Sequence, residues 1–435
     1  MSDTHAQSVA FVRQTVIPPA PPPATEAGAV KWVRENLFST WANAIMTVLG
    51  VLIVFWLLSG LIPWIVNGTW EGENIRDCRE ILQGNGGGCF AVIAQRWEQF
   101  LFGFAYPEEF YWRPTLAFAL LFVAVPPALF PMFLPRWTLL VTALYPFVAY
   151  WLIWGGSALG PVVAALGLIG GYYAFVSAEH RFGFFAGLVA GIVAAVLIWW
   201  IGGGLVEEFG RRVLRLSPVA SRDLGGFMLN LILGIVCVSL SLPLGIALAL
   251  GRQSRLPFIK GVCVIFIEFV RGVPLITLLF VANVVLAYFL PPGTNFDLIV
   301  RVVIMITMFS SAYIAEVIRG GLAALPKGQY EAADSLGLDY AQAMQLIILP
   351  QALKISIPGI VNVAVGLFKD TTLVSVISMF DLVGMIRGPI LSSTDWAGGI
   401  YWEPWAFACI LFFVVCYGIS QYSQWLERQL RTDHR

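Results

Sequence analysis

Two charged pairs lie in otherwise apolar stretches and share the spelling Glu-x-x-Arg-Gly. The first pair is Glu268 with Arg271, and the second is Glu316 with Arg319. Residues three apart share one face of a helix, so each glutamate can neutralise its arginine where a lone charge would be costly. We expect a charged layer that holds the ends of these helices together and transmits movement between them. The alternative is two local ion pairs whose only effect is to lower the free energy of placing charged side chains in an apolar environment.

A second polar group lies within the apolar stretch that begins near Ile355. One cation, one anion and several hydroxyls could together line a pathway for a solute that carries both charges. The candidates for this substrate pathway are Asn362, Lys369, Asp370, Thr371 and Thr372. Two alternatives stay open: Lys369 could pair with Asp381 or with a partner subunit, and Asn362 could make a hydrogen bond between helices.

The chain has few residues for covalent chemistry or for metal binding. Only three histidines occur, two of them within six residues of a terminus, which is too few for a histidine-based metal or proton-relay site. No Gly-Lys dipeptide occurs, which excludes a phosphate loop of the G-x-x-x-x-G-K-[ST] type. We therefore expect no enzyme activity and no metal or cofactor bound by this chain.

The composition indicates that a membrane surrounds these residues. Of 435 residues, 58% are apolar and 12% are charged, with a mean hydropathy of +0.80, whereas soluble domains carry about 25% charged residues. Ten apolar runs are long enough to cross a hydrocarbon layer of roughly 30 Å and predict an all-α polytopic bundle. They lie near residues 42–66, 114–134, 137–155, 159–177, 183–204, 226–250, 262–289, 298–317, 354–377 and 404–422.

Basic residues in the loops orient this bundle. Lysines and arginines in both tails and in the 251–261 loop predict that both termini face the cytoplasm, while the acidic loop 67–113 lies outside. Arginines within 205–225 disagree with this count. An amphipathic interfacial helix over Glu207–Leu216, or a miscounted span between residues 137 and 204, would explain them.

The outer loop contains two of the six cysteines. Cys78 and Cys89 are eleven positions apart around a glycine-rich turn. In an oxidising compartment they could form a disulfide, and two free thiols are the alternative.

The most polar segment between two late spans is residues 319–350. A turn at its start and a glycine further on predict a short helix over Gln329–Leu336 with a left-handed cap at Gly337. The small side chains of Ala332 and Ala333 would let this helix approach another protein closely.

A second helix is expected directly after the first. Asp339 followed by Gln342 has the spacing of a capping box, which starts a helix. Because proline disfavours helix at the residue before it, this second helix should stop before Pro350.

The 319–350 segment resembles the EAA loop of ABC importer permeases, written E-A-A-x3-G-x9-I-x-L-P, at every fixed position. The matching residues are Glu331, Ala332, Ala333, Gly337, Ile347, Leu349 and Pro350. In that family the EAA helix is the coupling helix that sits in a groove on a separate ATPase subunit. The resemblance therefore implies that these residues couple the chain to an ATPase.

Three further segments, residues 266–275, 313–321 and 369–377, look like segments of polar amino-acid permeases. Length and extra spans resemble the larger membrane subunit of bacterial general L-amino-acid transporters. The resemblance implies a permease subunit of an ATP-driven amino-acid importer in the bacterial inner membrane. Its implied partners are an ATPase dimer that binds the ATP and Mg, a second related permease and a periplasmic amino-acid-binding protein, with lipid around it and no nucleic acid.

The expected organisation has four parts. A proline-rich disordered cytoplasmic tail covers residues 1–40, an additional helical region covers 41–220, the importer transmembrane domain covers 221–425, and a short cytoplasmic tail covers 426–435. The additional region carries no motif of its own.

Two other function classes were weighed against a permease subunit. An ion-coupled secondary amino-acid transporter would need intramembrane acids poised to titrate, but most acids here stand beside a basic residue. A lipid-modifying membrane enzyme would need clustered acids or histidines at one interface, and the sequence has no such cluster.

Overall fold

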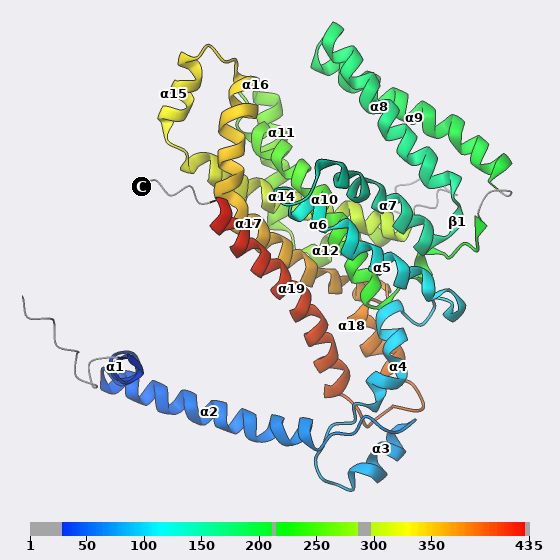
Figure 1. Ribbon diagram of the computed structural model, residues 1–435, viewed down its shortest axis with the longest axis vertical. Helices are drawn as coiled ribbons and strands as arrows, with labels where there is room; N and C mark the ends of the chain where they lie inside the picture. Colours follow the sequence, from blue (N-terminus) through cyan, green and yellow to red (C-terminus); the bar gives the residue numbers. More distant parts are fainter. Residues whose placement is uncertain (1–27, 211–214, 286–296, 431–435) are drawn as a thin grey trace, which may run out of the picture. The chain divides into compact units, whose positions relative to one another are not determined.

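A computed structural model describes residues 28–210, 215–285 and 297–430, and most of them are helical (Figure 1). The chain divides into two compact units. One comprises the residues up to Thr69 together with Leu82–Gly88, and the other comprises Trp70–Ile81 and the chain from Cys89 onward.

The first unit is built on helices α1 (Gly28–Asn36) and α2 (Trp41–Val66). Helix α2 begins where the hydroxyl of Thr40 accepts the backbone N–H of Asn43, and none of its residues is buried, as suits a span surrounded by lipid. Helix α1 lies within the tail that was predicted to be disordered, so that prediction is wrong for these nine residues. An i,i+4 pair between Lys31 and Glu35 supports this helix.

The second unit begins with the additional helical region. Its elements are α3 (Ile75–Leu82), α4 (Ala91–Phe102), α5 (Trp112–Ala124), α6 (Pro126–Leu129), α7 (Leu139–Trp154), α8 (Leu159–Phe182), α9 (Phe184–Phe209) and the two short strands β1 (Gly156–Ser157) and β2 (Arg215–Leu216). The strands pair antiparallel. The prediction of an interfacial helix over Glu207–Leu216 is therefore wrong. The start of this segment belongs to α9, and its end belongs to strand β2, whose backbone hydrogen bonds are made with β1. Residues 211–214 lie outside the described residues.

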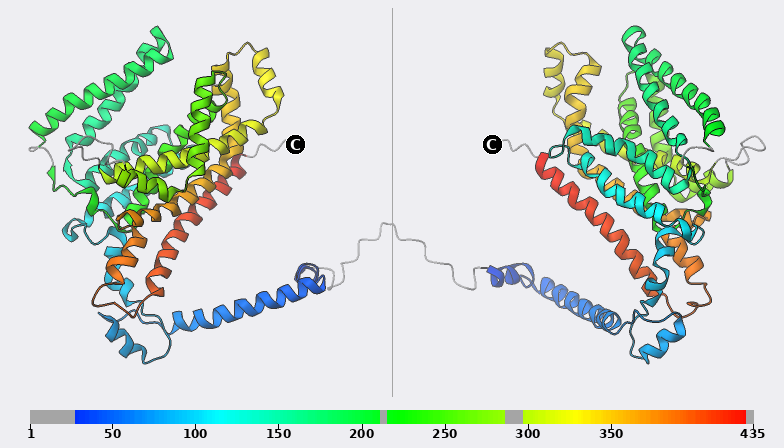
Figure 2. Two further views of the ribbon diagram at one scale, coloured as in Figure 1. Left: turned by 180° about the vertical axis from the view of Figure 1, so that it is seen from behind. Right: turned by 45° about the vertical axis from the view of Figure 1, so that its right-hand side comes forward.

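The rest of the second unit is the predicted transmembrane domain. Its helices are α10 (Gly226–Arg252), α11 (Pro257–Gly272), α12 (Leu275–Phe280), α14 (Leu298–Ala324), α15 (Lys327–Ser335), α16 (Tyr340–Ala343), α17 (Leu349–Asp370), α18 (Leu382–Met385) and α19 (Trp402–Leu430). Helix α10 packs along α14, α14 along α17, and α17 along α19, the last two drawn in orange and red in Figure 2. Tighter or wider turns interrupt them at η5 (Val281–Val285), η6 (Met344–Ile348), η7 (Thr371–Ile377) and η8 (Ile386–Ile390).

Nine helices of the described chain are long and apolar enough to cross a membrane. The predicted tenth span, over 262–289, is not one continuous helix, because α11 and the following α12–η5 segment meet at 103°. Pro274 has no N–H to continue the helix, and it holds Val273 in an extended conformation. The segment is therefore either a broken span or a re-entrant loop.

The additional region is fastened to the transmembrane domain at one end. Cys78 and Cys89 are joined by a disulfide, and the backbone N–H of Cys89 donates to the buried carboxylate of Glu403 at 3.0 Å. Arg96 and Asp395 add an ion pair of 2.9 Å. These contacts hold the segment around α3 and α4 against the loop that precedes α19.

Replacing Cys78 by serine is expected to loosen this segment. A cross-link over eleven positions removes about 3 kcal/mol of chain entropy from the open state, so amide hydrogen exchange in α3 should become about a hundredfold faster or more. Dithiothreitol should reproduce the effect in the unchanged chain. The matched change at an unpaired cysteine, Cys409→Ser, should leave exchange in α3 unaltered. If α3 exchanges equally slowly in the unchanged chain, the reduced chain and the Cys78→Ser variant, the disulfide does not constrain this segment.

Candidate functional site

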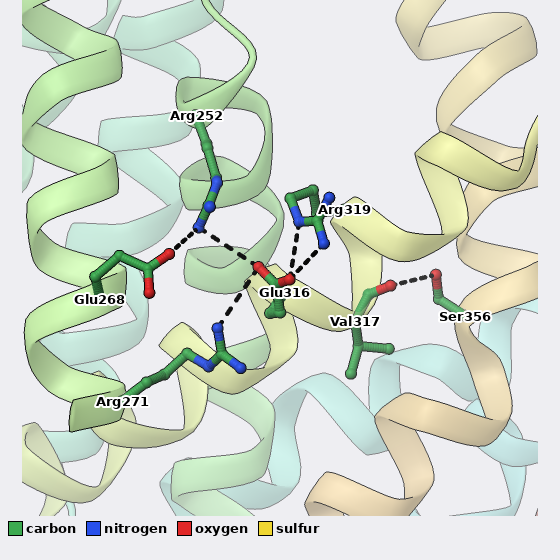
Figure 3. A network of polar contacts seen from close by, with 7 residues as sticks. All are labelled: Arg252, Glu268, Arg271, Glu316, Val317, Arg319 and Ser356. Carbon is green, nitrogen blue, oxygen red and sulfur yellow. Dashed lines mark hydrogen bonds and ion pairs between the residues drawn. The ribbon is translucent and has the colours of Figure 1, made fainter. Parts of the chain in front are cut away.

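The carboxylate of Glu316 lies at the centre of a charged layer formed by α10, α11 and α14 (Figure 3). It accepts Arg319 Nε at 2.9 Å, lies 3.4 Å from Arg252 Nη1 and lies 3.7 Å from Arg271 Nη1. Arg252 also reaches Glu268, with Nη1 2.8 Å from Oε1. One carboxylate thus connects arginines from three helices.

The four predicted layer residues do meet, but only one of the two predicted pairs, Glu316 with Arg319, forms. Glu268 and Arg271 were expected to neutralise one another, yet the ion pairs of the described residues join Glu268 to Arg252 and Arg271 to Glu316. The guanidinium of Arg271 also lies 5.6 Å from the ring centre of Tyr313. The alternative of two merely local pairs therefore holds only for Glu316 with Arg319.

Arg252 is the member of the layer that the sequence did not indicate. It appeared only as one of several basic residues that orient the loop after α10. Its partners lie 16 and 64 residues away in sequence, so no helical spacing connects them. With Arg252 included, three arginines face two glutamates, a formal excess of one positive charge.

The first helix of the EAA loop, α15, has two distinct faces. Ala333 is fully buried, whereas Glu331 and Ala332 are exposed. The expectation that both alanines approach another protein is therefore wrong for Ala333. Successive helical residues point about 100° apart, so one of two neighbouring alanines can be buried while the other faces outward.

The turn that ends α15 has the predicted geometry. Gly337 adopts a φ of +71°, in the left-handed region that glycine tolerates. The capping box is also confirmed, because the side chain of Asp339 accepts the N–H of Gln342 and the side chain of Gln342 accepts the N–H of Asp339. These features fix the angle between α15 and the next helix.

The prediction that the second helix stops before Pro350 is wrong. The chain remains helical from Tyr340 to Ile377. Just before the proline it forms the wider π turn η6, in which the N–H of Leu349 bonds to the carbonyl of Met344. A wider turn relieves the clash that a proline ring makes with an α-helical backbone, so the helix passes through the proline.

An apolar cluster joins the EAA loop to the charged layer. It includes Ile314 and Ile318 of α14 together with Met344, Ile348 and Ala352. In the last turns of α14, the isoleucines therefore pack toward the EAA loop, while Glu316 and Arg319 belong to the charged layer.

Two polar contacts reinforce this junction. Ser356 of α17 donates to the carbonyl of Val317 at 3.3 Å (Figure 3), and Gln351 donates to Gln329 of α15 at 3.0 Å. Ile347 packs at the edge of the same cluster.

A groove of about 1110 Å³ opens beside α15, between the EAA loop and the connector that follows α10. It is lined by Arg255 of the connector and by Tyr330, Asp334 and Tyr340 of the loop. Burial raises the pKa of Tyr330 above its usual range, and Tyr340 adds to this effect. The loop therefore stands away from the connector on this side.

One of the predicted substrate-pathway residues lies in the interior of the chain. Thr371 is fully buried, where its hydroxyl donates to the carbonyl of Phe368 at 2.7 Å. Thr372 donates to the carbonyl of Lys369, and both Lys369 and Asn362 are exposed. Thr371 therefore belongs to the interior of this chain.

The possible pairing of Lys369 with Asp381 is wrong. Asp381 is fully buried, and its carboxylate accepts hydrogen bonds from the side chain of Asn230 and from the backbone N–H groups of Val383 and Gly384. Asp370 is partly buried beside Lys369. Spacing along one helix could not show that Asp381 would turn toward α10.

The chain is similar to known transport proteins over nearly its whole length. A family model described as "Binding-protein-dependent transport system inner membrane component" matches residues 241–432. The chain is 50% identical to the glutamate/glutamine/aspartate/asparagine transport system permease protein BztC of Rhodobacter capsulatus over 100% of both chains. It is 36% identical to the inner membrane amino-acid ABC transporter permease protein YhdY of Escherichia coli, over 95% of this chain and 96% of that one.

Shorter relatives match about half of the chain. The probable glutamine ABC transporter permease protein GlnP of Bacillus subtilis is 30% identical, over 46% of this chain and 90% of its own length. Among solved structures, the crystal structure of an amino acid ABC transporter with histidines is 34% identical over 47% of this chain and 92% of that chain, with a TM-score of 0.42.

Proposed function

Since the chain belongs to the amino-acid ABC transporter permeases of the inner membrane, we propose that α15 docks an ATPase subunit and that the charged layer passes its movement into the membrane helices. The observation that carries this proposal is the division of α15 into two faces. Ala333 anchors the helix to its own chain, while Glu331, Ala332 and the 73% exposed Leu336 remain available to a partner.

The packing gives a continuous path for such movement. A shift of α15 acts on the cluster around Met344 and Ile348, and that cluster acts on the last turns of α14. Glu316 then acts on α10 and α11 through Arg252 and Arg271. ATP-driven closure of two ATPase subunits would favour one arrangement of these helices, and hydrolysis would release it.

The remaining partners are part of the same proposal. A second related permease completes the pathway, a periplasmic amino-acid-binding protein delivers the substrate, and both termini face the cytoplasm. The 50% identical relative is named for glutamate, glutamine, aspartate and asparagine, so these four amino acids are the first substrates to test here.

The decisive experiment is purification of the tagged full chain from membranes, followed by reconstitution of whatever copurifies into liposomes. We expect a stoichiometric ATPase, ATP hydrolysis stimulated by amino acid with its binding protein, and ATP-dependent uptake of glutamate or glutamine that an ionophore does not abolish. Uptake driven by an ion gradient without ATP would instead support an ion-coupled transporter, and the absence of any bound ATPase would overturn the proposal.

A further inference from the structure

A second buried polar cluster lies at the end of α10 that is distant from the charged layer. It consists of Asn230 on α10, Thr371 at the end of α17, and Asp381 before α18, and all three are fully buried. The Nδ2 atom of Asn230 donates to Thr371 Oγ1 at 2.9 Å and to Asp381 Oδ2 at 3.1 Å. We call these three residues the clamp.

Backbone contacts around the clamp join the same elements. The side-chain oxygen of Asn230 accepts the N–H of Leu382 at 3.1 Å, so all its polar atoms are used. The N–H of Gly226, at the start of α10, donates to the carbonyl of Phe380 at 2.8 Å. One turn after Asn230, Gly234 leaves room for the ring of Phe368. The start of α10 is thereby fixed to the elbow between α17 and α18.

The clamp keeps a carboxylate in a costly place. Asp381 accepts three N–H groups, and none of the ion pairs in the described part of the chain involves it. Burial raises its pKa to about 6 although these hydrogen bonds oppose the rise. An apolar side chain packed at this position would destabilise the fold less than a buried carboxylate does. This points to a role of Asp381 in fixing the geometry of the elements around it rather than in stabilising the fold.

The clamp lies at the ends of α10 and α17 that are opposite the charged layer and the EAA loop, respectively. Asn230 precedes Arg252 of the charged layer by 252 − 230 = 22 residues, and Thr371 follows Leu349 of the EAA loop by 371 − 349 = 22 residues. At about 1.5 Å per helical residue, each separation is roughly 33 Å, close to the thickness of the hydrocarbon layer. A displacement at the loop must cross this length to affect the far side.

We propose that Asn230, Thr371 and Asp381 are positioning residues for transport, which make the far ends of α10 and α17 move as one body. The charged layer and the apolar cluster link the near ends of α10, α14 and α17, and the clamp links the far ends. This inference rests on the proposed coupling to an ATPase. Without the clamp, movement begun at α15 would be lost in relative sliding of the two helices.

The test uses the complete reconstituted transporter with the variants Asp381→Asn and Thr371→Val. Both preserve side-chain shape while removing a charge or one acceptor. We expect basal ATP hydrolysis and the amount of assembled complex to stay within twofold of the unchanged protein. The number of ATP molecules hydrolysed per amino acid imported should rise about fivefold or more, since a lost buried hydrogen bond costs roughly 1 kcal/mol or more.

The matched control is Ser423→Ala, which removes a buried hydroxyl that, in the described part of the chain, donates to Glu427 of the same helix. It should leave the ratio unchanged. An unchanged ratio in both clamp variants, or a loss of import and hydrolysis in proportion to a loss of complex, would overturn the inference. If the complete transporter with the unchanged chain does not hydrolyse ATP, the proposed function is overturned instead. The two failures are therefore distinguishable.

Discussion

Replacing Glu316 by glutamine is expected to reduce amino-acid import about tenfold or more while the chain still reaches the membrane. The neutral side chain leaves Arg271 and Arg319 without their carboxylate partner. Glu316 is 24% exposed, so water screens part of the loss, and a cost of about 1–3 kcal/mol remains. Each 1.4 kcal/mol corresponds to about a tenfold change in an equilibrium. The measurement is uptake by reconstituted transporter, normalised to the amount of complex.

The matched control is Glu268→Gln in the same layer. Among the described residues the ion pair of Glu268 is with Arg252, and the Glu268 side chain is 54% exposed, so this pair is worth about 1 kcal/mol or less. Import should fall less than about fivefold in this variant. Equal effects at Glu268 and Glu316 would mean that the layer acts only through total charge. A loss that follows complex abundance alone would reduce Glu316 to a stabilising role.

Replacing Ala332 by tryptophan is expected to separate the chain from its ATPase. Ala332 is exposed on the face of α15 that its own chain leaves free, so the larger ring should fit the fold but not a close-packed interface. We expect the ATPase to be retained at least tenfold less strongly on the tagged chain, a loss of about 1.4 kcal/mol or more. The measurement is the amount of ATPase bound after washing, compared by titration.

Ala94→Trp provides the same substitution at another exposed alanine. Ala94 lies on α4, which packs at the far end of α10, close to Gly226. ATPase retention should be unchanged in this variant. Full retention of the ATPase by the Ala332 variant would exclude this face of α15 as the docking surface. Poor membrane insertion of both variants would mean that the size of the tryptophan, and not its position, causes the loss of ATPase.

Some features of this protein follow from neighbouring residues and were therefore predictable from the sequence. Gly337 needs only its own backbone freedom, and the capping box of Asp339 and Gln342 closes within three residues. The apolar spans likewise depend on local hydropathy, because lipid requires each one to satisfy its own backbone. The same local reasoning failed at Pro350, where a π turn absorbed the strain expected to end the helix.

Contacts between helices were decided by the tertiary structure alone. The sequence gives Glu268 and Arg271 an apparent partnership three residues apart, yet each finds its partner on another helix. From the sequence, Thr371 was a candidate for the substrate pathway and Asp381 a possible partner of Lys369. In the fold, both are buried and bonded to Asn230, which is 141 residues from Thr371 and 151 residues from Asp381. Helical periodicity fixes which face a side chain occupies. Which helix covers that face depends on packing across the whole bundle, and charge pairs form wherever that packing brings them within reach.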